Sequence, residues 1–448
     1  MRILLVSYYF PPFNTIGAVR VGKTAAHLRR LGHEVRVLTA RDQPLLPSLP
    51  LEIPSEHVTA TPWLDVNRPI EMALGGRRRV AERGFAPPAV GRSWFKRLGA
   101  LYRSLVNLPD GQIGWLPFAL AAGRKLCRDF QPDLILASST PPTSLLVGAA
   151  LAKQHAIPWV AELRDLWVGE LGYSHPAWRR WFEKRLERRV LASAAGMVTV
   201  SEPLARQLRA EHRQPVAIVL NGFDPHDFAR PAPTPNPALP LRLVYTGMIY
   251  EGRRDCESLL AALAELGPEA EQIRVEFYGR YLSNVQSLAA QYGVGHLVET
   301  HASVGYREAL ALQQSADLLL MLLERGPRAR GAYSGKLFEY LGARRPILAL
   351  GDATSLPGRL ITQRRAGVVL DDPRAIAEHL RQRLSEKRAG TIAPISAAAG
   401  RGLSRQAQTR RLAQFLEWIL AQPGARSTLG RSTSQPVNDR LGRVPVAV

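Results

Sequence analysis

The sequence has 448 residues, with 59 Lys and Arg against 38 Asp and Glu, which gives a formal net charge of +21. Its length predicts two or three domains, and 46% hydrophobic with 22% charged residues excludes a fibrous or wholly disordered chain. Two cysteines, Cys127 and Cys256, exclude a disulfide scaffold and a cysteine-rich zinc site and suit a reducing cytoplasm. No apolar run reaches the roughly 20 residues of a membrane-spanning helix, and the opening MRILLVSYYFPP predicts a first strand rather than a signal peptide.

Short Leu- and Val-rich runs alternate with helical patterns along most of the chain. The expected strands are Ile3–Val6, Val35–Thr39, Leu134–Ala137, Trp159–Glu162, Met197–Val200, Ile218–Leu220, Leu243–Tyr245, Val275–Tyr278, Leu318–Leu323, Ile347–Leu350 and Val368–Leu370. The expected helices include Val21–Leu31, Pro142–His155, Ala177–Ala194, Cys256–Glu265, Tyr306–Ser315 and Lys336–Ala343. This alternation predicts an α/β protein with doubly wound parallel sheets.

A proline-rich segment, RPAPTPNPALP at residues 230–240, divides the chain and predicts an interdomain linker. It separates an N-terminal domain, 1–229, from a C-terminal domain, 241–403. Residues 41 to about 115 fall outside the alternation and are expected to form an insertion. A helix over 404–422, with apolar residues on one face, is expected to pack back toward the N-terminal domain, and 423–448 is expected to be a disordered tail.

The first loop is Pro-rich and ends at Gly17, directly before a helix. A glycine at a helix N-terminus allows a ligand, above all an anion, to approach the backbone. A tight strand-to-helix turn is the alternative explanation. The GxGxxG pattern of dinucleotide-binding domains is absent.

Several motifs occur in a characteristic order: the opening ILLVSYYFPPFNTIG with its GHEV turn, PDLILASSTPP, VAELRDLW, AAGMVTVSEPLARQL, VLNGFDPHDF, SADLLLMLL and SGKLFEYLGARRPILAL. Together they resemble the family 4 glycosyltransferases over about residues 1–350. The resemblance implies the GT-B fold, in which two Rossmann-like domains face each other across a cleft. It also implies a retaining enzyme that uses a nucleotide-sugar donor.

The donor site is expected where the chain leaves a buried strand and enters the helix that begins near Lys336. Ser334 is the expected N-cap, Gly335 permits close approach, and Lys336 with the helix N-terminus would meet the donor diphosphate. Glu339 lies one turn further on the same face, and the resemblance implies that it accepts the ribose hydroxyls. An ordinary surface lysine and a surface ion pair are the alternatives.

A second phosphate site is expected around Gly247 in the segment YTGMIYEGRRD. The resemblance implies a cation just after this glycine, but Met248 takes that place. Arg253, with Arg254 beside it, is therefore expected to bind phosphate through its guanidinium. An exposed arginine pair, one of them neutralised by Asp255, is the alternative.

A further departure concerns the sugar. The family often has a second Glu eight positions before the ribose-binding one, and this sequence has Gly331 there. Arg325, Arg328, Arg330 or a loop amide is expected to replace that contact.

On the acceptor side, Asp165 follows the strand Trp159–Glu162 and could orient or deprotonate an acceptor hydroxyl. Capping a turn and pairing with Arg164 is the alternative for Asp165, and Glu162 should point the other way. The resemblance favours a front-face mechanism in which the protein neutralises the leaving diphosphate, so Lys336 and Arg253 are the other catalytic candidates. Neither a metal nor a cofactor is expected.

Two basic segments with aromatic residues, Arg92–Val106 and Pro176–Val190, allow two interpretations. They are interfacial helices on an anionic membrane, or core-packed helices with solvated basic faces. Nucleic-acid binding is not expected, because no zinc finger or RNA-binding signature occurs.

The sequence as a whole predicts a cytoplasmic glycosyltransferase, peripheral to the inner membrane face. Its donor would be UDP- or GDP-linked, with a hexosyl or N-acetylhexosaminyl group. Its acceptor would be a saccharide or lipid-linked saccharide of bacterial surface polysaccharide assembly. Two alternatives stay open: a GT-B nucleotide-sugar epimerase, and a non-catalytic protein that binds membrane or polysaccharide.

Overall fold

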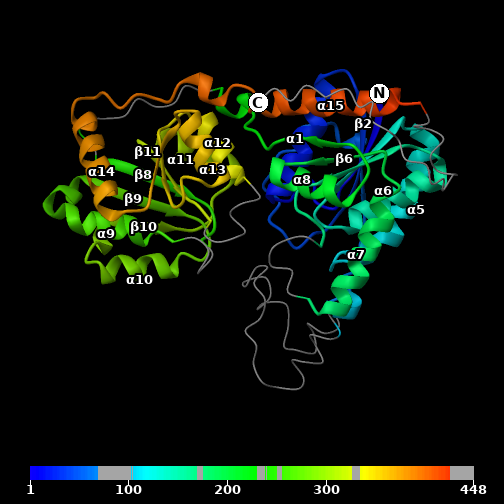
Figure 1. The fold of residues 1–448 in the computed structure, drawn as a ribbon, viewed down its shortest axis with the longest axis horizontal. Coiled ribbons are helices and arrows are strands. Elements are labelled where there is room, and N and C mark those ends of the chain that lie inside the picture. Colours follow the sequence, from blue (N-terminus) through cyan, green and yellow to red (C-terminus); the bar gives the residue numbers. More distant parts are fainter. Residues whose placement is uncertain are drawn as a thin grey trace.

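The computed structural model describes residues 1–68, 102, 104–168, 175–229, 238, 240–249, 255–324 and 333–423. Their strands form two separate sheets, one from each half of the chain, and helices cover both (Figure 1). All strand pairs in both sheets are parallel. The expected doubly wound architecture is confirmed.

The first sheet has seven strands in the order β3-β2-β1-β4-β5-β6-β7. These strands are β1 (Arg2–Val6), β2 (Glu34–Ala40), β3 (Val58–Thr61), β4 (Leu134–Ser139), β5 (Trp159–Leu163), β6 (Gly196–Thr199) and β7 (Val216–Ile218). Its helices are α1 (Ile16–Arg30), α5 (Leu116–Phe130), α6 (Thr143–His155), α7 (Ala177–Leu191) and α8 (Glu202–Glu211). The strand order reverses between β1 and β4.

The second sheet has six strands in the order β10-β9-β8-β11-β12-β13. These strands are β8 (Leu241–Thr246), β9 (Ile273–Tyr278), β10 (Val298–His301), β11 (Leu318–Leu322), β12 (Ile347–Leu350) and β13 (Gly367–Leu370). Its helices are α9 (Glu257–Leu266), α10 (Ser283–Gln291), α11 (Tyr306–Ser315), α12 (Gly335–Ala343), α13 (Leu356–Gln363) and α14 (Pro373–Arg388). Here the order reverses between β8 and β11.

Single 3-10 turns join several of these elements. They are η1 (Ser55–His57), η2 (Ile113–Trp115), η3 (Pro225–Phe228), η4 (Gly267–Gln272), η5 (Gly295–Leu297) and η7 (Ala397–Gly400).

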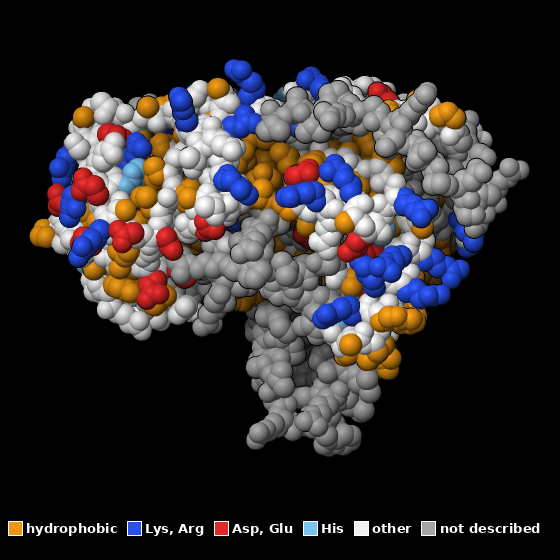
Figure 2. Space-filling model, in the orientation of Figure 1, with side chains coloured by type: hydrophobic (Ala, Val, Ile, Leu, Met, Phe, Trp, Pro, Cys, Tyr) orange, Lys and Arg blue, Asp and Glu red, His pale blue; other side chains and the backbone are white. Residues whose placement is uncertain are grey.

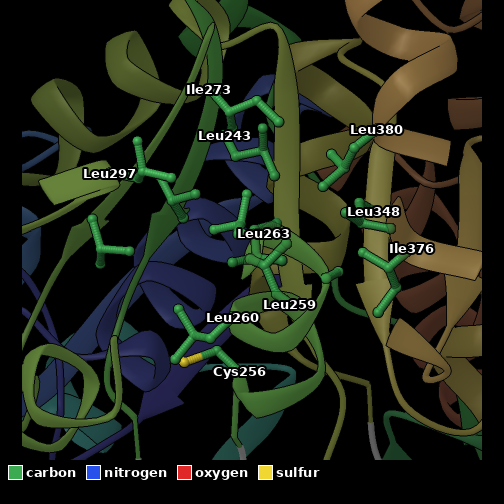
Figure 3. Packing of buried hydrophobic residues seen from close by; sticks show 14 of the residues in the cluster. Leu243, Cys256, Leu259, Leu260, Leu263, Ile273, Leu297, Leu348, Ile376 and Leu380 are labelled. Carbon is green, nitrogen blue, oxygen red and sulfur yellow. The ribbon is translucent and has the colours of Figure 1, made fainter. Parts of the chain in front are cut away.

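Each sheet has apolar side chains on both faces, as its nearly continuous apolar strands require. On one face of the second sheet, leucines of α9 and α14 pack over those of the central strands (Figure 3). The residues labelled there are Leu243, Cys256, Leu259, Leu260, Leu263, Ile273, Leu297, Leu348, Ile376 and Leu380. Burying each such leucine or isoleucine contributes about 1.5–3 kcal/mol. Both sheets are therefore rigid platforms for the loops at their strand ends.

Part of the expected insertion belongs to the first sheet. The segment Val58–Thr61 forms β3 at its edge, paired in parallel with β2. Trp63 and Trp115 pack edge-on against Tyr8, with ring centroids 5.7 and 5.6 Å away. The prediction of an insertion over 41–115 is thus wrong for these residues, because sheet pairing gives a four-residue strand its conformation. Residues 69–101, which include most of the expected basic helix, lie outside the described residues.

The last helix, α15 (Arg405–Ala421), lies along the first domain, although it follows the second in sequence (Figure 1). Its apolar face, Leu412, Phe415, Leu416 and Ile419, joins the core formed by β1, β2 and α1. Residues Phe223 and Ser404 form a β-bridge where the chain passes back between the domains. The two halves are therefore joined at two adjacent crossings. Among the described helices, none has the length and apolar composition that crossing a bilayer requires.

Candidate active site

Two helix starts meet between the domains. Helix α1 follows the loop after β1, and α12 follows the loop after β11, so both begin beyond carboxyl ends of strands next to the points where strand order reverses. A Cβ on Gly335 would lie only 2.7 Å from Ile16 Cδ1, which means that the two starts touch. Open α/β sheets bind ligands at such places, and helix N-termini favour anions.

The side chain of Lys336 packs against the backbone of Gly247. The glycine has φ +143°, and a Cβ there would stand 2.0 Å from Lys336 Cε and 2.3 Å from Nζ. The Lys336 ammonium also lies 5.3 Å from the centre of the Tyr245 ring. Two of the expected diphosphate-binding residues, far apart in sequence, therefore share one location. A side chain at position 247 would exclude the lysine from it.

Ser334 occupies the N-cap position of α12, as expected, with an extended backbone of φ −66° and ψ 137°. Its side chain makes no capping hydrogen bond, whereas Thr15 accepts the Ala18 N–H at the start of α1. The hydroxyl of Ser334 thus stands at the positive end of α12 beside Lys336. Hydroxyl, ammonium and helix dipole together suit a phosphate group.

Glu339 is half-buried one turn into α12. Its Oε2 accepts a hydrogen bond of 3.2 Å from Gln313 Nε2, which also donates to Thr246 Oγ1 at 2.9 Å. Burial raises the pKa of Glu339, and the Gln313 hydrogen bond and the charge of Lys336 oppose that effect only in part. Gln313 therefore joins the carboxylate to the end of β8 and orients it.

Several expected site residues lie outside the described residues. They are Arg253, Arg254, Arg325, Arg328, Arg330 and Gly331.

The guanidinium of Arg164 lies directly over Gly17, and the expected approach of a ligand to this glycine stays a prediction. A Cβ there would lie 2.2 Å from Arg164 Nη1, so the guanidinium of Arg164 occupies the space above it. Arg164 also donates to the Ser139 carbonyl at 2.7 Å and to the Thr140 carbonyl at 2.8 Å. The first domain thus presents a fixed guanidinium at the start of α1.

Asp165 is exposed just after the end of β5. Its Oδ2 accepts a hydrogen bond of 3.2 Å from Thr140 Oγ1, which follows β4. An exposed carboxylate at this edge could contact an acceptor hydroxyl. The sequence prediction of its position agrees with the structure, and its role remains a hypothesis.

Glu162 points to the opposite side, as strand alternation requires. It is buried, with Arg20 Nη2 2.8 Å from Oε1 and the Ser138 hydroxyl 2.5 Å from Oε2. Burial opposes ionisation of Glu162, but the Arg20 charge and the Ser138 hydrogen bond outweigh it and lower its pKa. Arg20 also donates to the carbonyl of Val219 at 2.9 Å. This ion pair therefore fixes α1 to the sheet and to the segment that leads to the crossing.

A second buried ion cluster lies at the crossing itself. The ammonium of Lys23 contacts Asp224 at 2.8 Å, Asp227 at 2.8 Å and Glu52 at 2.6 Å. The Tyr306 hydroxyl, from the second domain, donates to Asp227 Oδ2 at 3.0 Å. The three carboxylates lie close enough to hold a metal ion, but Lys23 already supplies the cation that they share. Sequence reasoning missed Gln313, Lys23 and Tyr306, and only the NGFD motif around Asp224 indicated this crossing.

Residues 17–222 match the model of the glycosyl transferase 4-like domain. The chain therefore contains a glycosyl transferase 4-like domain. This family retains the configuration of the transferred sugar, so the predicted retaining enzyme is confirmed at that level. The matched domain is a glycosyltransferase domain, which favours sugar transfer over epimerisation. No curated protein sequence matches this glycosyltransferase.

Solved structures of the same architecture support the fold. Sucrose-phosphate synthase from Thermosynechococcus elongatus is 16% identical, with a TM-score of 0.63 over 94% of this chain and 99% of that one. Anabaena HepE in complex with UDP-glucose is 15% identical, with a TM-score of 0.59 over 93% and 100%. WaaG, a glycosyltransferase involved in lipopolysaccharide biosynthesis, is 15% identical, with a TM-score of 0.54 over 94% and 100%. At these identities the likeness shows the GT-B fold and nothing more.

Proposed function

We propose that this glycosyltransferase moves a sugar from a UDP- or GDP-linked donor to a hydroxyl of a saccharide or lipid-linked saccharide in bacterial surface polysaccharide assembly. The observation that carries the proposal is the contact of Lys336 with Gly247 at the start of α12, where that helix meets α1. A cation, a glycine and a helix N-terminus at one point suit a diphosphate leaving group. The structural neighbour HepE is described with UDP-glucose, which makes UDP the first donor to test.

In the proposed complex, Lys336, Ser334 and the backbone of Gly335 and Gly247 hold the diphosphate. Arg253 and Arg254, which follow β8 in sequence, are proposed to add further charge. Glu339, oriented by Gln313, accepts the ribose hydroxyls.

The proposed transfer occurs on one face of the sugar. The bond between the anomeric carbon and the donor phosphate oxygen breaks, and the nucleoside diphosphate leaves with that electron pair. The acceptor oxygen bonds to the anomeric carbon from the same side, and its proton passes to the departing phosphate oxygen. Lys336 and Arg253 stabilise the charge that develops there, so the proposal includes no metal ion. Asp165 orients the acceptor hydroxyl.

Thermal unfolding with UDP, GDP and their common sugar conjugates tests the donor site. A nucleotide at about 100 times its Kd should add about 2.7 kcal/mol of stability and raise the Tm. Lys336→Ala should lose this rise, while Lys153→Ala, at an exposed lysine of α6, should keep it. The proposal fails if neither nucleotide raises the Tm of the unmodified enzyme, or if Lys336→Ala keeps the full rise. Incubation with the sugar conjugates, with and without EDTA, then identifies the donor and tests metal independence.

We also propose that the enzyme works in the cytoplasm. Both cysteines, Cys127 and Cys256, are free thiols in the cores of the two domains. Free buried thiols suit a reducing compartment.

A further inference from the structure

Helix α7 carries an exposed aromatic cluster. Trp178, Trp181 and Phe182 are 47%, 67% and 43% exposed, and Leu105 is 57% exposed. Figure 2 shows hydrophobic side chains gathered at the lower end of α7, with Lys and Arg side chains beside them. A surface tryptophan with two thirds of its area in water is uncommon without a partner, because large apolar patches favour burial.

The orientation of α7 is fixed by the buried guanidinium of Arg179. Arg179 Nε lies 2.6 Å from Glu183 Oε1, and both side chains are almost fully buried. The same guanidinium donates to the carbonyls of Ser104 at 3.1 Å and of Asn107. These contacts hold the first turn of α7 against the segment that bears Leu105. Rotation of the helix that would bury Trp181 would expose this charged pair, so the aromatic side chains are held outward.

Acidic and basic side chains lie on different sides of α7. Its two acidic residues, Glu183 and Glu187, are buried, whereas Arg185, Arg188 and Arg189 are exposed. The outward side of this fully described helix therefore combines aromatic rings at its start with arginines along its later turns. We call the set Leu105, Trp178, Trp181, Phe182, Arg185, Arg188 and Arg189 the α7 face.

We propose that the α7 face docks onto an anionic lipid bilayer. The aromatic side chains would enter the interface between headgroups and acyl chains, where Trp is favoured. Arg185, Arg188 and Arg189 would lie along the headgroup phosphates, where each arginine strengthens binding about fivefold. Single-stranded nucleic acid, in contrast, is bound in grooves, whereas the α7 face is the outward side of one helix (Figure 1).

The α7 face is connected to the acceptor side of the site. After the carbonyls held by Arg179, the chain reaches Asp110, which accepts the Thr143 N–H at 2.6 Å at the start of α6. Thr143 follows the end of β4, where Thr140 contacts Asp165. Docking would therefore place the acceptor side near the membrane, and this last step rests on the proposed function. The docking itself does not depend on it.

Vesicle flotation of the full-length enzyme tests the proposal. Vesicles of phosphatidylethanolamine with phosphatidylglycerol should carry the protein up the gradient, and vesicles of phosphatidylcholine alone should not. Raising the salt from 0.1 to 0.5 M should weaken the binding. The double variant Trp181→Gln/Phe182→Gln should bind roughly tenfold more weakly. The triple variant Arg185→Gln/Arg188→Gln/Arg189→Gln should bind roughly a hundredfold more weakly.

Matched control variants distinguish docking through the α7 face from nonspecific adsorption of the protein to vesicles. Leu46→Gln removes an exposed leucine and Arg206→Gln an exposed arginine elsewhere on the first domain, and both should bind as the unmodified enzyme does. The Tm rise with nucleotide should persist in all variants, so a failure of the donor proposal would be visible separately. The proposal is overturned if the enzyme does not bind anionic vesicles at low salt, or if both α7 variants bind them as well as the unmodified enzyme does. It is also overturned if these variants still bind vesicles but lose binding to an oligonucleotide or to a protein.

Discussion

Lys336 and Gly247 follow the two strands, β11 and β8, between which the strand order of the second sheet reverses, and the two residues are in contact. The glycine directly follows β8 and the lysine lies in the first turn of α12. The lysine side chain fills the space where a Cβ at position 247 would stand, 2.0 Å from Lys336 Cε. Because β8 and β11 are neighbours, the loops after them must meet. The contact is therefore a consequence of the sheet order, and it fixes a cation at the junction of two domains.

Replacing Gly247 by alanine should disable the donor site. At φ +143° an alanine is strained, and its Cβ would displace Lys336. We expect a loss of about 1–3 kcal/mol in the free energy of unfolding and the loss of the Tm rise with UDP or GDP. Calorimetry with and without nucleotide measures both.

A matched variant isolates the effect of Lys336. Gly293 in the same domain has φ +74° with no atom within 4 Å of a new Cβ. Gly293→Ala should therefore cost similar stability but keep the nucleotide response. Equal nucleotide responses in the two alanine variants would contradict the assignment of Lys336 to the diphosphate.

Gln313→Leu should weaken donor binding through Glu339. The substitution removes the hydrogen bonds to Thr246 at 2.9 Å and to Glu339 at 3.2 Å, at a cost of about 1–3 kcal/mol in stability. A carboxylate that is no longer oriented should raise the donor KM about five- to tenfold with little change in kcat. Steady-state kinetics over a range of donor concentrations measures the changes in KM and kcat separately, and Gln291→Leu, at an exposed position of α10, is the control. A fall in kcat alone would show that Gln313 serves another step.

The motifs that could be predicted are those that depend on short segments. The apolar run Leu318–Leu322 and the following SGK sequence predicted both the strand and the start of α12, since burial and capping act over a few residues. The position of Asp165 followed in the same way from its strand. These features gave the fold class and the general location of the site.

The residues that were missed depend on long-range contacts. Gln313 is one polar residue in an ordinary helix, and its partners lie 67 and 26 positions away in sequence. The sequence also could not show that Arg164 would lie over Gly17. Strand β3 has only four residues, so its pairing with β2 decides its conformation. Sequence alone cannot supply such tertiary neighbours.

The ion cluster at the crossing should make the enzyme sensitive to acid. Burial opposes ionisation of Asp224, but hydrogen bonds from His27 and Lys23 outweigh it and lower its pKa well below the ordinary value of 3.8. The stabilisation is therefore fully present above pH 3.8 and is lost as the pH falls toward the lowered pKa of the folded state. Denaturant unfolding between about pH 7 and pH 2 should show decreasing stability from about pH 4 downward.

Asp224→Asn measures how much of the loss of stability at low pH comes from this ion cluster. Breaking the contact with Lys23 should cost about 3–5 kcal/mol at pH 7 and make the acid dependence shallower. Asp129→Asn, at an exposed position of α5, should leave both quantities unchanged. An acid dependence that is as steep in Asp224→Asn as in the unmodified enzyme would assign it to other carboxyls, of which Glu162 also has a lowered pKa.

Asp165→Asn separates an acceptor role from a structural one. If the carboxylate orients the acceptor hydroxyl, kcat should fall about 10²-fold, while the Tm and its rise with nucleotide stay unchanged. Thr140→Val, which removes the 3.2 Å hydrogen bond to Asp165, should lower kcat by a smaller factor, because it misplaces the carboxylate without removing it. A stabilising turn would give the reverse pattern, with a lower Tm and nearly normal kcat. The exposure of Asp165 favours the first outcome, since an exposed carboxylate holds little of the fold together and is accessible to an acceptor.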